Sequence, residues 1–152
     1  MKIDLVKLQK KGKSKESFSF RYQPETRAVS IPNVEIYGEV EVEGEVELIT
    51  RNEAIVDYTV RYTLKGSCSR CGDDATKIVE EAVVEKFYEE GYAPSGEEDA
   101  YLYKNGVIDL AKSVDDIISL SMPMQIICKE DCLGLCSSCG CNLNKEKCNC
   151  EK

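Results

Sequence analysis

The sequence contains no histidine. This absence excludes Ser-His and Cys-His catalytic pairs, mixed Cys/His zinc fingers and the usual three-histidine catalytic zinc. No run approaches the roughly 18 apolar residues that span a bilayer, and lysines interrupt the apolar residues of the N-terminus, which is unlike a secretion signal. We therefore expect a cytoplasmic protein without a membrane partner, in which any metal site is built from sulfur.

Charge is distributed unevenly along the chain, whose formal net charge is -8. Residues 1–27 have a balance of +5, residues 28–127 a balance of -13, and the last 25 residues carry four charges of each sign. An acidic body repels phosphate. Contact with nucleic acid is therefore expected only at the basic N-terminal segment, through Lys10, Lys11, Lys13 and Lys15, or beside the cysteines. The alternative for these four lysines is a solvated hairpin tip.

Two long stretches alternate between apolar and polar residues. In residues 34–48 every even position is apolar or glycine, and six of the odd positions are glutamate. The alternation resumes over residues 54–64, after a turn at residues 50–52. A period of two predicts strands with one buried face, so these stretches are expected to be antiparallel neighbours. Gly38 and Gly44 are expected to mark bends or bulges, and the glutamates a solvated face.

The remaining elements are shorter. Residues 109–118 predict a helix that Asp109 caps and that ends before Pro123. Strands are expected at residues 3–8, 18–22 and 76–88, and a short hairpin with an Asn-Gly turn at residues 101–108. The fold class expected is α+β but mainly β: an antiparallel long-hairpin sheet or partial barrel, one C-terminal helix and a cysteine-rich zinc-binding tail.

Nine cysteines are the strongest chemical signal. In a reducing compartment they favour metal or redox chemistry over disulfides. Two copies of Cys-x-x-Cys-Gly stand out, because two intervening residues let both sulfurs reach one ion and the glycine can adopt the positive φ that closes the turn. The motifs are accompanied by two further pairs, so that the candidate ligands are Cys68, Cys71, Cys128, Cys132, Cys136, Cys139, Cys148 and Cys150.

Eight sulfurs suffice for two tetrahedral zinc sites, although one ion is also compatible with the sequence. The preferred pairing joins Cys68 and Cys71 to Cys128 and Cys132, and Cys136 and Cys139 to Cys148 and Cys150, leaving Cys141 over. An iron–sulfur cluster remains an alternative, although the ferredoxin spacing is absent. A thioredoxin-like dithiol is disfavoured because no βαβ pattern surrounds either motif.

The cysteine-rich tail has few apolar residues besides Leu133, Leu135 and Leu143. Burial alone cannot offset roughly 1–2 kcal/mol of backbone entropy per residue, so metal binding is expected to supply its order. The predicted domains are therefore a β-rich domain over residues 1–127, with its helix near 110–121, and a zinc-binding module over residues 128–152, docked on the motif at residues 68–71.

Several segments taken together resemble a known family. They are Cys68-Ser-Arg-Cys71, Val107-Ile-Asp-Leu110, Ile117-Ile-Ser-Leu-Ser-Met-Pro123, Cys132-Leu-Gly-Leu-Cys136-Ser-Ser-Cys139-Gly140, Asn142-Leu-Asn144 and Cys148-Asn-Cys150. In this order they resemble the YceD-like family, the large ribosomal RNA subunit accumulation proteins of bacteria and plastids. The similarity covers residues 30–152, and the cysteine-rich end is its most specific part.

The resemblance implies a non-catalytic ribosome-biogenesis factor that supports accumulation or processing of 23S ribosomal RNA and assembly of the large subunit. The expected partner is pre-ribosomal RNA or a basic ribosomal protein, with no small-molecule substrate. Lys129, Lys145 and Lys147, near the thiolates, leave room for a nucleic-acid surface. The alternative function is a metal- or redox-responsive regulator that uses labile cysteine thiolates.

Overall fold

A computed structural model describes residues 1–24, 31–96 and 100–150, so the last two residues of the predicted zinc-binding module lie outside the described residues. Its elements in chain order are β1 (Lys2–Asp4), α1 (Leu5–Lys10), β2 (Lys15–Tyr22), β3 (Val34–Leu48), β4 (Glu53–Ser67), β5 (Asp74–Glu89), β6 (Tyr101–Tyr103), β7 (Val107–Asp109) and α2 (Ala111–Ser121). No helix of the described residues is long and apolar enough to cross a membrane.

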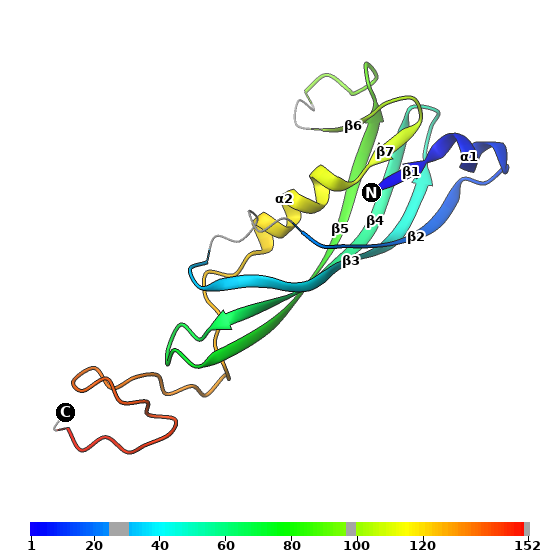
Figure 1. Cartoon of the computed structure of the whole chain (residues 1–152). Helices are drawn as coiled ribbons and strands as arrows, with labels where there is room; N and C mark the ends of the chain where they lie inside the picture. Colours follow the sequence, from blue (N-terminus) through cyan, green and yellow to red (C-terminus); the bar gives the residue numbers. More distant parts are fainter. Residues whose placement is uncertain (25–30, 97–99, 151–152) are drawn as a thin grey trace.

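An open five-stranded sheet in the order β2-β3-β4-β5-β6 dominates the molecule (Figure 1). The pairs are antiparallel except for β5 and β6, which run parallel over three residues. The predicted fold class is confirmed: the protein is mainly β, its long hairpin is β3 and β4, and α2 follows the sheet. The sheet is open and does not close into a complete barrel.

The two glycines of β3 have different roles. Gly38 has a φ of 79° and lies where the register of β3 against β4 shifts, as predicted for a bulge. Gly44 is in regular register opposite Tyr58, so there is no bulge there. Glycine is needed at this position because a Cβ would lie 2.6 Å from the Tyr58 Cβ.

One face of the sheet forms the core with α2. The even-numbered residues of β4 from Ala54 to Leu64 are all buried, as the alternating pattern predicts. Two of them hold the helix directly: the Tyr58 hydroxyl hydrogen-bonds with that of Ser113, and the Tyr62 hydroxyl with that of Ser121 at 2.9 Å. The side chains of β4 and α2 are thereby fixed against each other.

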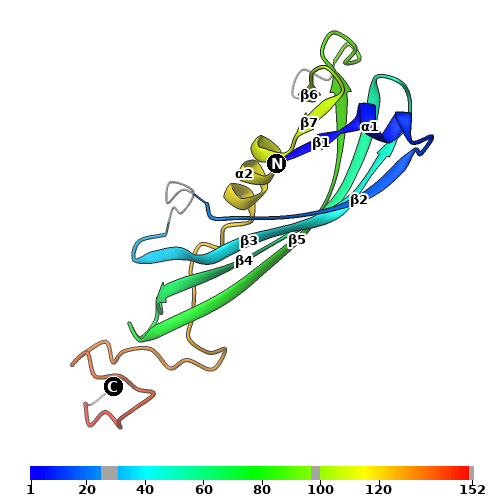
Figure 2. The ribbon, with the colours of Figure 1, turned by 45° about the vertical axis from the view of Figure 1, so that its right-hand side comes forward.

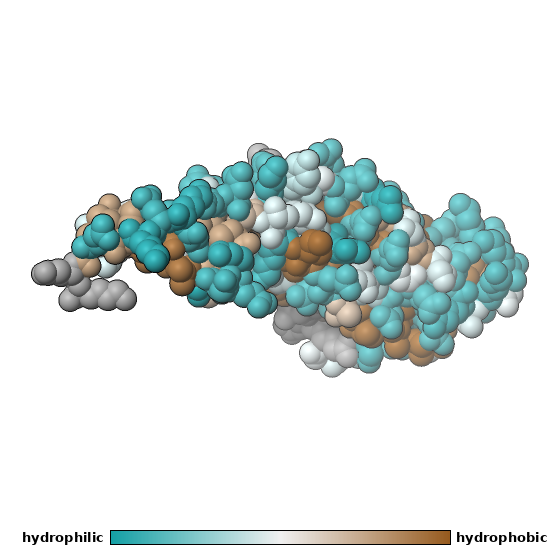
Figure 3. All heavy atoms as spheres, turned by 90° about the horizontal axis from the view of Figure 1, so that it is seen from below, coloured by the Kyte–Doolittle hydropathy of each residue, from teal (hydrophilic) through white to brown (hydrophobic). Residues whose placement is uncertain are grey.

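The opposite face carries most of the β3 glutamates, and cross-strand contacts satisfy several of them. Ser17 and Ser19 of β2 hydrogen-bond Glu45 and Glu43, each at 3.2 Å, and Arg21 pairs with Glu41. This agrees with the solvated-face interpretation of the sequence. A view from below shows a mostly hydrophilic surface with separate apolar patches (Figure 3).

The prediction of a strand over residues 3–8 is wrong beyond Asp4. The Asp4 side chain accepts a hydrogen bond from the Lys7 N–H at 3.0 Å and so caps α1. Leu5 and Leu8, three residues apart, are both buried. Their spacing fits a helical turn as well as a slipped strand, and the local cap favours the helix. The described residues therefore contain two helices, α1 and α2, where the sequence predicted one.

The predicted hairpin at residues 101–108 is correct only at its turn. Asn105 and Gly106 both have positive φ, and Lys104 bridges to Val107. Beyond the turn the flanking strands separate, because β6 joins β5 and β7 pairs with β1 in a second, two-stranded sheet. The strand expected at residues 76–88 is β5, and α2 begins after Asp109, whose carboxylate accepts the Ala111 N–H at 3.0 Å.

The two regions singled out by the sequence lie at opposite ends of the elongated molecule (Figures 1 and 2). The cysteine-rich segment extends beyond the turn between β4 and β5. The lysine-rich segment between α1 and β2 lies at the other end. A single compact ligand therefore does not contact both.

Candidate metal centres

The first group of cysteines joins the tip of the β4–β5 hairpin to the chain that follows α2. Its four sulfurs, from Cys68, Cys71, Cys128 and Cys132, all lie within 4.8 Å of one another. The Sγ–Sγ distances are 3.8 Å between Cys68 and Cys132 and 3.6 Å between Cys71 and Cys128. Backbone contacts fix the approach of the two segments, since Ser69 donates its N–H to the Ile126 carbonyl at 2.8 Å.

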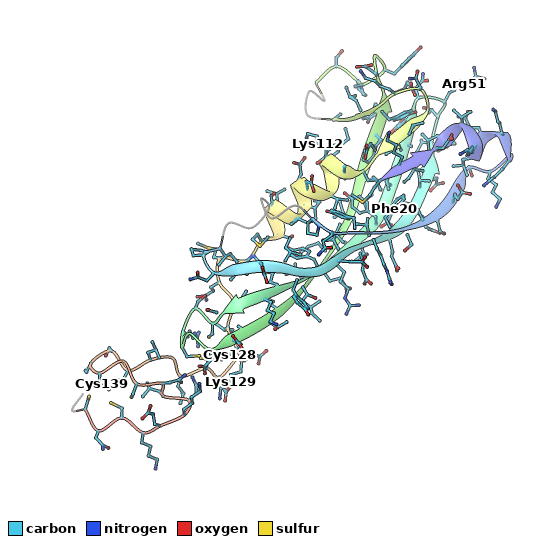
Figure 4. The ribbon with its side chains drawn as sticks, in the orientation of Figure 1. Phe20, Arg51, Lys112, Cys128, Lys129 and Cys139 are labelled. Atoms are coloured by element: carbon cyan, nitrogen blue, oxygen red, sulfur yellow. The ribbon has the colours of Figure 1, made fainter. Side chains whose placement is uncertain are left out.

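The second group is more local and lies in the C-terminal segment. It brings together the sulfurs of Cys136, Cys139, Cys148 and Cys150, again within 4.8 Å of one another. A bridge between Leu135 and Asn142 forms a small hairpin around the motif. Cys139 is exposed, whereas Cys68, Cys71 and Cys132 of the first group are buried. Figure 4 shows Cys139 in the C-terminal loop and Cys128 near the end of the long sheet.

Both Cys-x-x-Cys-Gly motifs form the same turn, as their repetition predicts. The N–H of Gly72 bonds the Cys68 carbonyl at 2.9 Å, and the N–H of Gly140 bonds the Cys136 carbonyl at 2.8 Å. Their φ values are 76° and 75°, in the left-handed region that favours glycine. The turn presents two sulfurs to the same point in space.

The sulfur positions fit a tetrahedral metal ion. Four ligands about 2.3 Å from a zinc ion are separated from one another by about 3.8 Å. Four of the observed sulfur–sulfur separations run from 3.2 Å to 3.8 Å, and no pair within a group exceeds 4.8 Å. A disulfide requires about 2.05 Å. In a four-iron cluster each thiolate binds a different iron, which spreads the sulfurs further apart. Each group can therefore hold one metal ion.

Electrostatics favour a cation in both groups. Burial opposes ionisation of the Cys68 thiol, yet backbone N–H groups, that of Arg70 first among them, lower its pKa to about 6. The Cys139 N–H and further hydrogen bonds lower the pKa of Cys136 to about 6. Desolvation and the neighbouring thiols raise the pKa of Cys128 to about 12, because several negative sulfurs in one place repel each other. A bound cation removes that repulsion.

A polar network connects the two groups. Asp73, which directly follows the first Cys-x-x-Cys-Gly motif, accepts hydrogen bonds from the Asn142 amide at 2.9 Å and the Lys145 ammonium at 2.7 Å. Asn144 donates to the Cys132 sulfur at 3.4 Å and accepts the Leu133 N–H at 2.9 Å. Residues of the second loop therefore position a sulfur of the first group, in the manner of outer-shell ligands.

Sequence reasoning did not assign a role to Asp73, Asn142 or Asn144. The two asparagines carried a signal, because they form part of the family resemblance. No sequence signal pointed to Asp73, because a carboxylate after a Cys-x-x-Cys-Gly turn is common. Its role follows only from the contacts that the C-terminal segment makes with it. Cys141 belongs to neither group; its carbonyl accepts the Cys136 N–H at 2.8 Å, which gives it a backbone role.

The structure separates the candidate lysines by their contacts. Lys10 ends α1 and Lys15 begins β2, so the exposed loop between them is shorter than predicted. Lys11 pairs with Glu16 at 2.9 Å and Lys15 with Glu45 at 2.7 Å. Lys10 and Lys13 form no ion pair within the described part of the chain.

Comparison with known proteins gives partial matches to relatives. The chain is 44% identical over 43 residues to the large ribosomal RNA subunit accumulation protein YCED homolog 1, chloroplastic, of Arabidopsis thaliana, covering 28% of this chain and 13% of that protein. The maize protein of the same name is 40% identical over 45 residues, covering 29% of this chain and 15% of that protein. An uncharacterised protein of Mycobacterium tuberculosis is 31% identical over 98 residues, covering 60% of this chain and 46% of that protein.

The chain thus spans less than half the length of these curated relatives. No solved structure matches it. A family model described as large ribosomal RNA subunit accumulation protein YceD matches residues 56–152, which is more than half of the chain and includes all eight sulfurs of the two groups. The chain therefore belongs to the YceD family.

Proposed function

We propose that this protein is a non-catalytic ribosome-biogenesis factor of the cytoplasm, that it supports accumulation of 23S ribosomal RNA during large-subunit assembly, and that zinc stabilises its structure. The observation that carries the proposal is the family match over residues 56–152. The cysteine geometry adds to it, because two sets of four sulfurs at tetrahedral spacing are typical of structural zinc, whereas catalytic zinc retains an open position.

Zinc would be held by four thiolates in each group and would supply cross-links but no reacting group. Around the first ion, Cys68 and Cys71 come from the sheet, and Cys128 and Cys132 from the chain after α2. Holding these segments together gives the C-terminal segment a fixed position relative to the sheet. The second ion orders the local loop, and the Asp73 contacts with Asn142 and Lys145 then set its orientation.

The partner is either pre-ribosomal RNA or a basic ribosomal protein. Ion pairs with Glu16 and Glu45 neutralise Lys11 and Lys15. If RNA binds the N-terminal segment, its contacts must depend on Lys10 and Lys13. Replacing these two by alanine would then weaken RNA binding and lower its salt dependence, whereas absence of RNA binding at low salt would favour the protein partner.

Complementation tests the proposed function. Cells that lack this protein are expected to contain less 23S relative to 16S ribosomal RNA, and the unmodified protein should restore the ratio. Cys71→Ser should fail to restore it because the first centre loses a ligand, whereas Cys141→Ser should succeed. An unchanged ratio in the deleted cells would reject the proposed function.

A second candidate is the redox-responsive regulator. The exposure of Cys139 favours it, because an accessible thiolate reacts with oxidants more readily than a buried one. Release of one zinc ion by mild oxidant, followed by rebinding on reduction, with a matching change in ribosomal RNA levels, would select this candidate.

A further inference from the structure

One edge of β5 is largely unpaired within the described residues and lies beside exposed apolar side chains. On one side β5 pairs with β4 along almost its whole length. On the other side, β6 pairs only with Phe87–Glu89. Within the described residues no strand pairs with Asp74–Lys86 on that side. At about 3.3 Å per residue this unpaired edge is roughly 40 Å long. Exposed edge strands in proteins are usually much shorter, because a long one can pair with another chain.

Two hollows follow this edge, between β5 and the chain that runs beside it. A hollow of about 430 Å³ lies between Glu81–Val84 and the end of α2, including Leu120. A hollow of about 620 Å³ lies between Thr76–Ile78 and the segment after α2, including Met124. Figures 1 and 2 show α2 and this segment alongside β5 in both views. The hollows therefore form a discontinuous groove along the edge.

Exposed apolar side chains border the groove on both sides. Ile78 and Val84 of β5 are 56% and 65% exposed, and Leu120 and Met124 are 82% and 97% exposed. Scattered apolar residues need no explanation, but these four lie along one strand edge on its two faces, where an added strand would cover them. Alternation places Ile78 and Val84 on the face away from α2.

The charges of the edge determine which strand it can accept. Glu81 and Glu85 lie on the α2 side of β5, and neither forms an ion pair with the described residues. Over residues 74–86 four acidic side chains stand against two lysines. A second copy of β5 paired about Val83 would set Glu81 opposite Glu85 and is disfavoured in that register, because like charges opposite each other destabilise a strand pair. A basic strand is complementary.

We propose that the β5 edge binds an extended, basic segment of a protein as an added strand, with lysine or arginine side chains toward Glu81 and Glu85 and apolar side chains toward Ile78 and Val84. The added strand would lie on the same side of β5 as β6, which pairs only with the C-terminal end of β5. Backbone hydrogen bonds would supply affinity, and the alternation of side chains specificity. The inference rests on the proposed function in one respect: that function identifies the protein that supplies the segment as a basic ribosomal protein.

The backbone of β5 allows a specific block. The Glu90 N–H bonds the Tyr103 carbonyl of β6, and the Glu89 N–H bonds the Asn52 carbonyl on the β4 side. Successive N–H groups therefore point to opposite edges of β5. By alternation the N–H of Ala82 points to the free edge. Ala82→Pro therefore removes an outward donor without removing a bond to β4, and proline is tolerated in such edge positions.

The test uses the full-length, zinc-loaded protein and a fluorescent peptide of about nine alternating lysine and valine residues, which matches the span of the groove. Fluorescence anisotropy should show binding, and hydrogen exchange should slow at residues 76–84. Glu81→Lys with Glu85→Lys should weaken binding by roughly tenfold or more, and Ala82→Pro should abolish it. The control variant, Glu39→Lys with Glu47→Lys, makes the same charge change on exposed positions of β3 and should bind normally.

Several results would overturn the proposal. They are absence of peptide binding, equal binding of a peptide interrupted by proline, equal loss in the control variant, or protection of the edge by self-association or by RNA. Complementation separates this inference from the proposed function. Normal 23S levels in cells carrying the edge variants would reject the edge as the functional contact, while dependence on Cys71 would still uphold the biogenesis role.

Discussion

Metal content tests the arrangement of the two centres directly. Because the eight sulfurs fall into two sets of four, each within 4.8 Å, the protein should bind about two zinc ions per chain. Cys71→Ser should reduce this to about one, and so should Cys148→Ser. Cys141→Ser should retain about two, because Cys141 lies outside both sets, and it serves as the matched control.

The size of the effect follows from the number of ligands. Structural zinc sites bind with about 10–16 kcal/mol, so one thiolate of four accounts for roughly 2.5–4 kcal/mol, or on the order of a hundredfold in affinity. Dialysis against a chelator of intermediate affinity should therefore empty the altered centre and leave the other filled. Elemental analysis per chain gives the result.

Two outcomes would refute this reasoning. Loss of both ions from Cys148→Ser would show that the centres are not independent. Loss of an ion from Cys141→Ser would show that Cys141 is a ligand and that the geometric grouping is wrong.

Three further predictions concern positions that hold the fold and the first centre. Asn144→Ala should weaken zinc binding at the first centre by about 10–100-fold, because the Cys132 sulfur loses its amide donor. A chelator titration measures the zinc affinity, and an unchanged affinity would show that Asn144 does not support the centre. Tyr58→Phe should cost about 1–3 kcal/mol in urea unfolding, since the buried Ser113 hydroxyl loses its hydrogen bond with Tyr58. Adding Ser113→Ala should recover part of that loss, and strictly additive losses would contradict the pairing. Gly44→Ala should destabilise by about 1–3 kcal/mol in thermal unfolding, and stability equal to that of Glu39→Ala would show that the backbone accommodates the methyl group.

The sequence predicted the elements whose pattern is long enough to be unambiguous. Alternation over residues 34–48 and 54–64 left no helical interpretation, and the repeated Cys-x-x-Cys-Gly motif required a glycine turn, which Gly72 and Gly140 form. The order of the strands in the sheet could be predicted only in part from the sequence. The adjacency of β3 and β4 was predictable because it is a local property of a hairpin.

Short and distant features were harder to predict. Six residues of α1 are fewer than two helical turns, and only the Asp4 cap distinguishes them from a strand. The separation of β6 from β7 depends on two other pairings: β6 joins β5 in parallel, and β7 joins β1 at the far end of the sequence, where Ile3 lies opposite Ile108. The contact of Asp73 with Asn142 and Lys145 is of the same kind, since it spans about 70 residues.

The two centres close loops of very different length. Cys68 and Cys132 are 64 positions apart, whereas Cys136 and Cys148 are 12 apart. Each doubling of a loop costs about 0.6 kcal/mol, so closing the longer one is harder by about 1.4 kcal/mol before any packing contributes. The short loop can acquire its ion as soon as its residues are synthesised, whereas the long one must wait until sheet and helix have met. Occupancy of the first centre thus reports that the β4–β5 turn and the chain after α2 have come together.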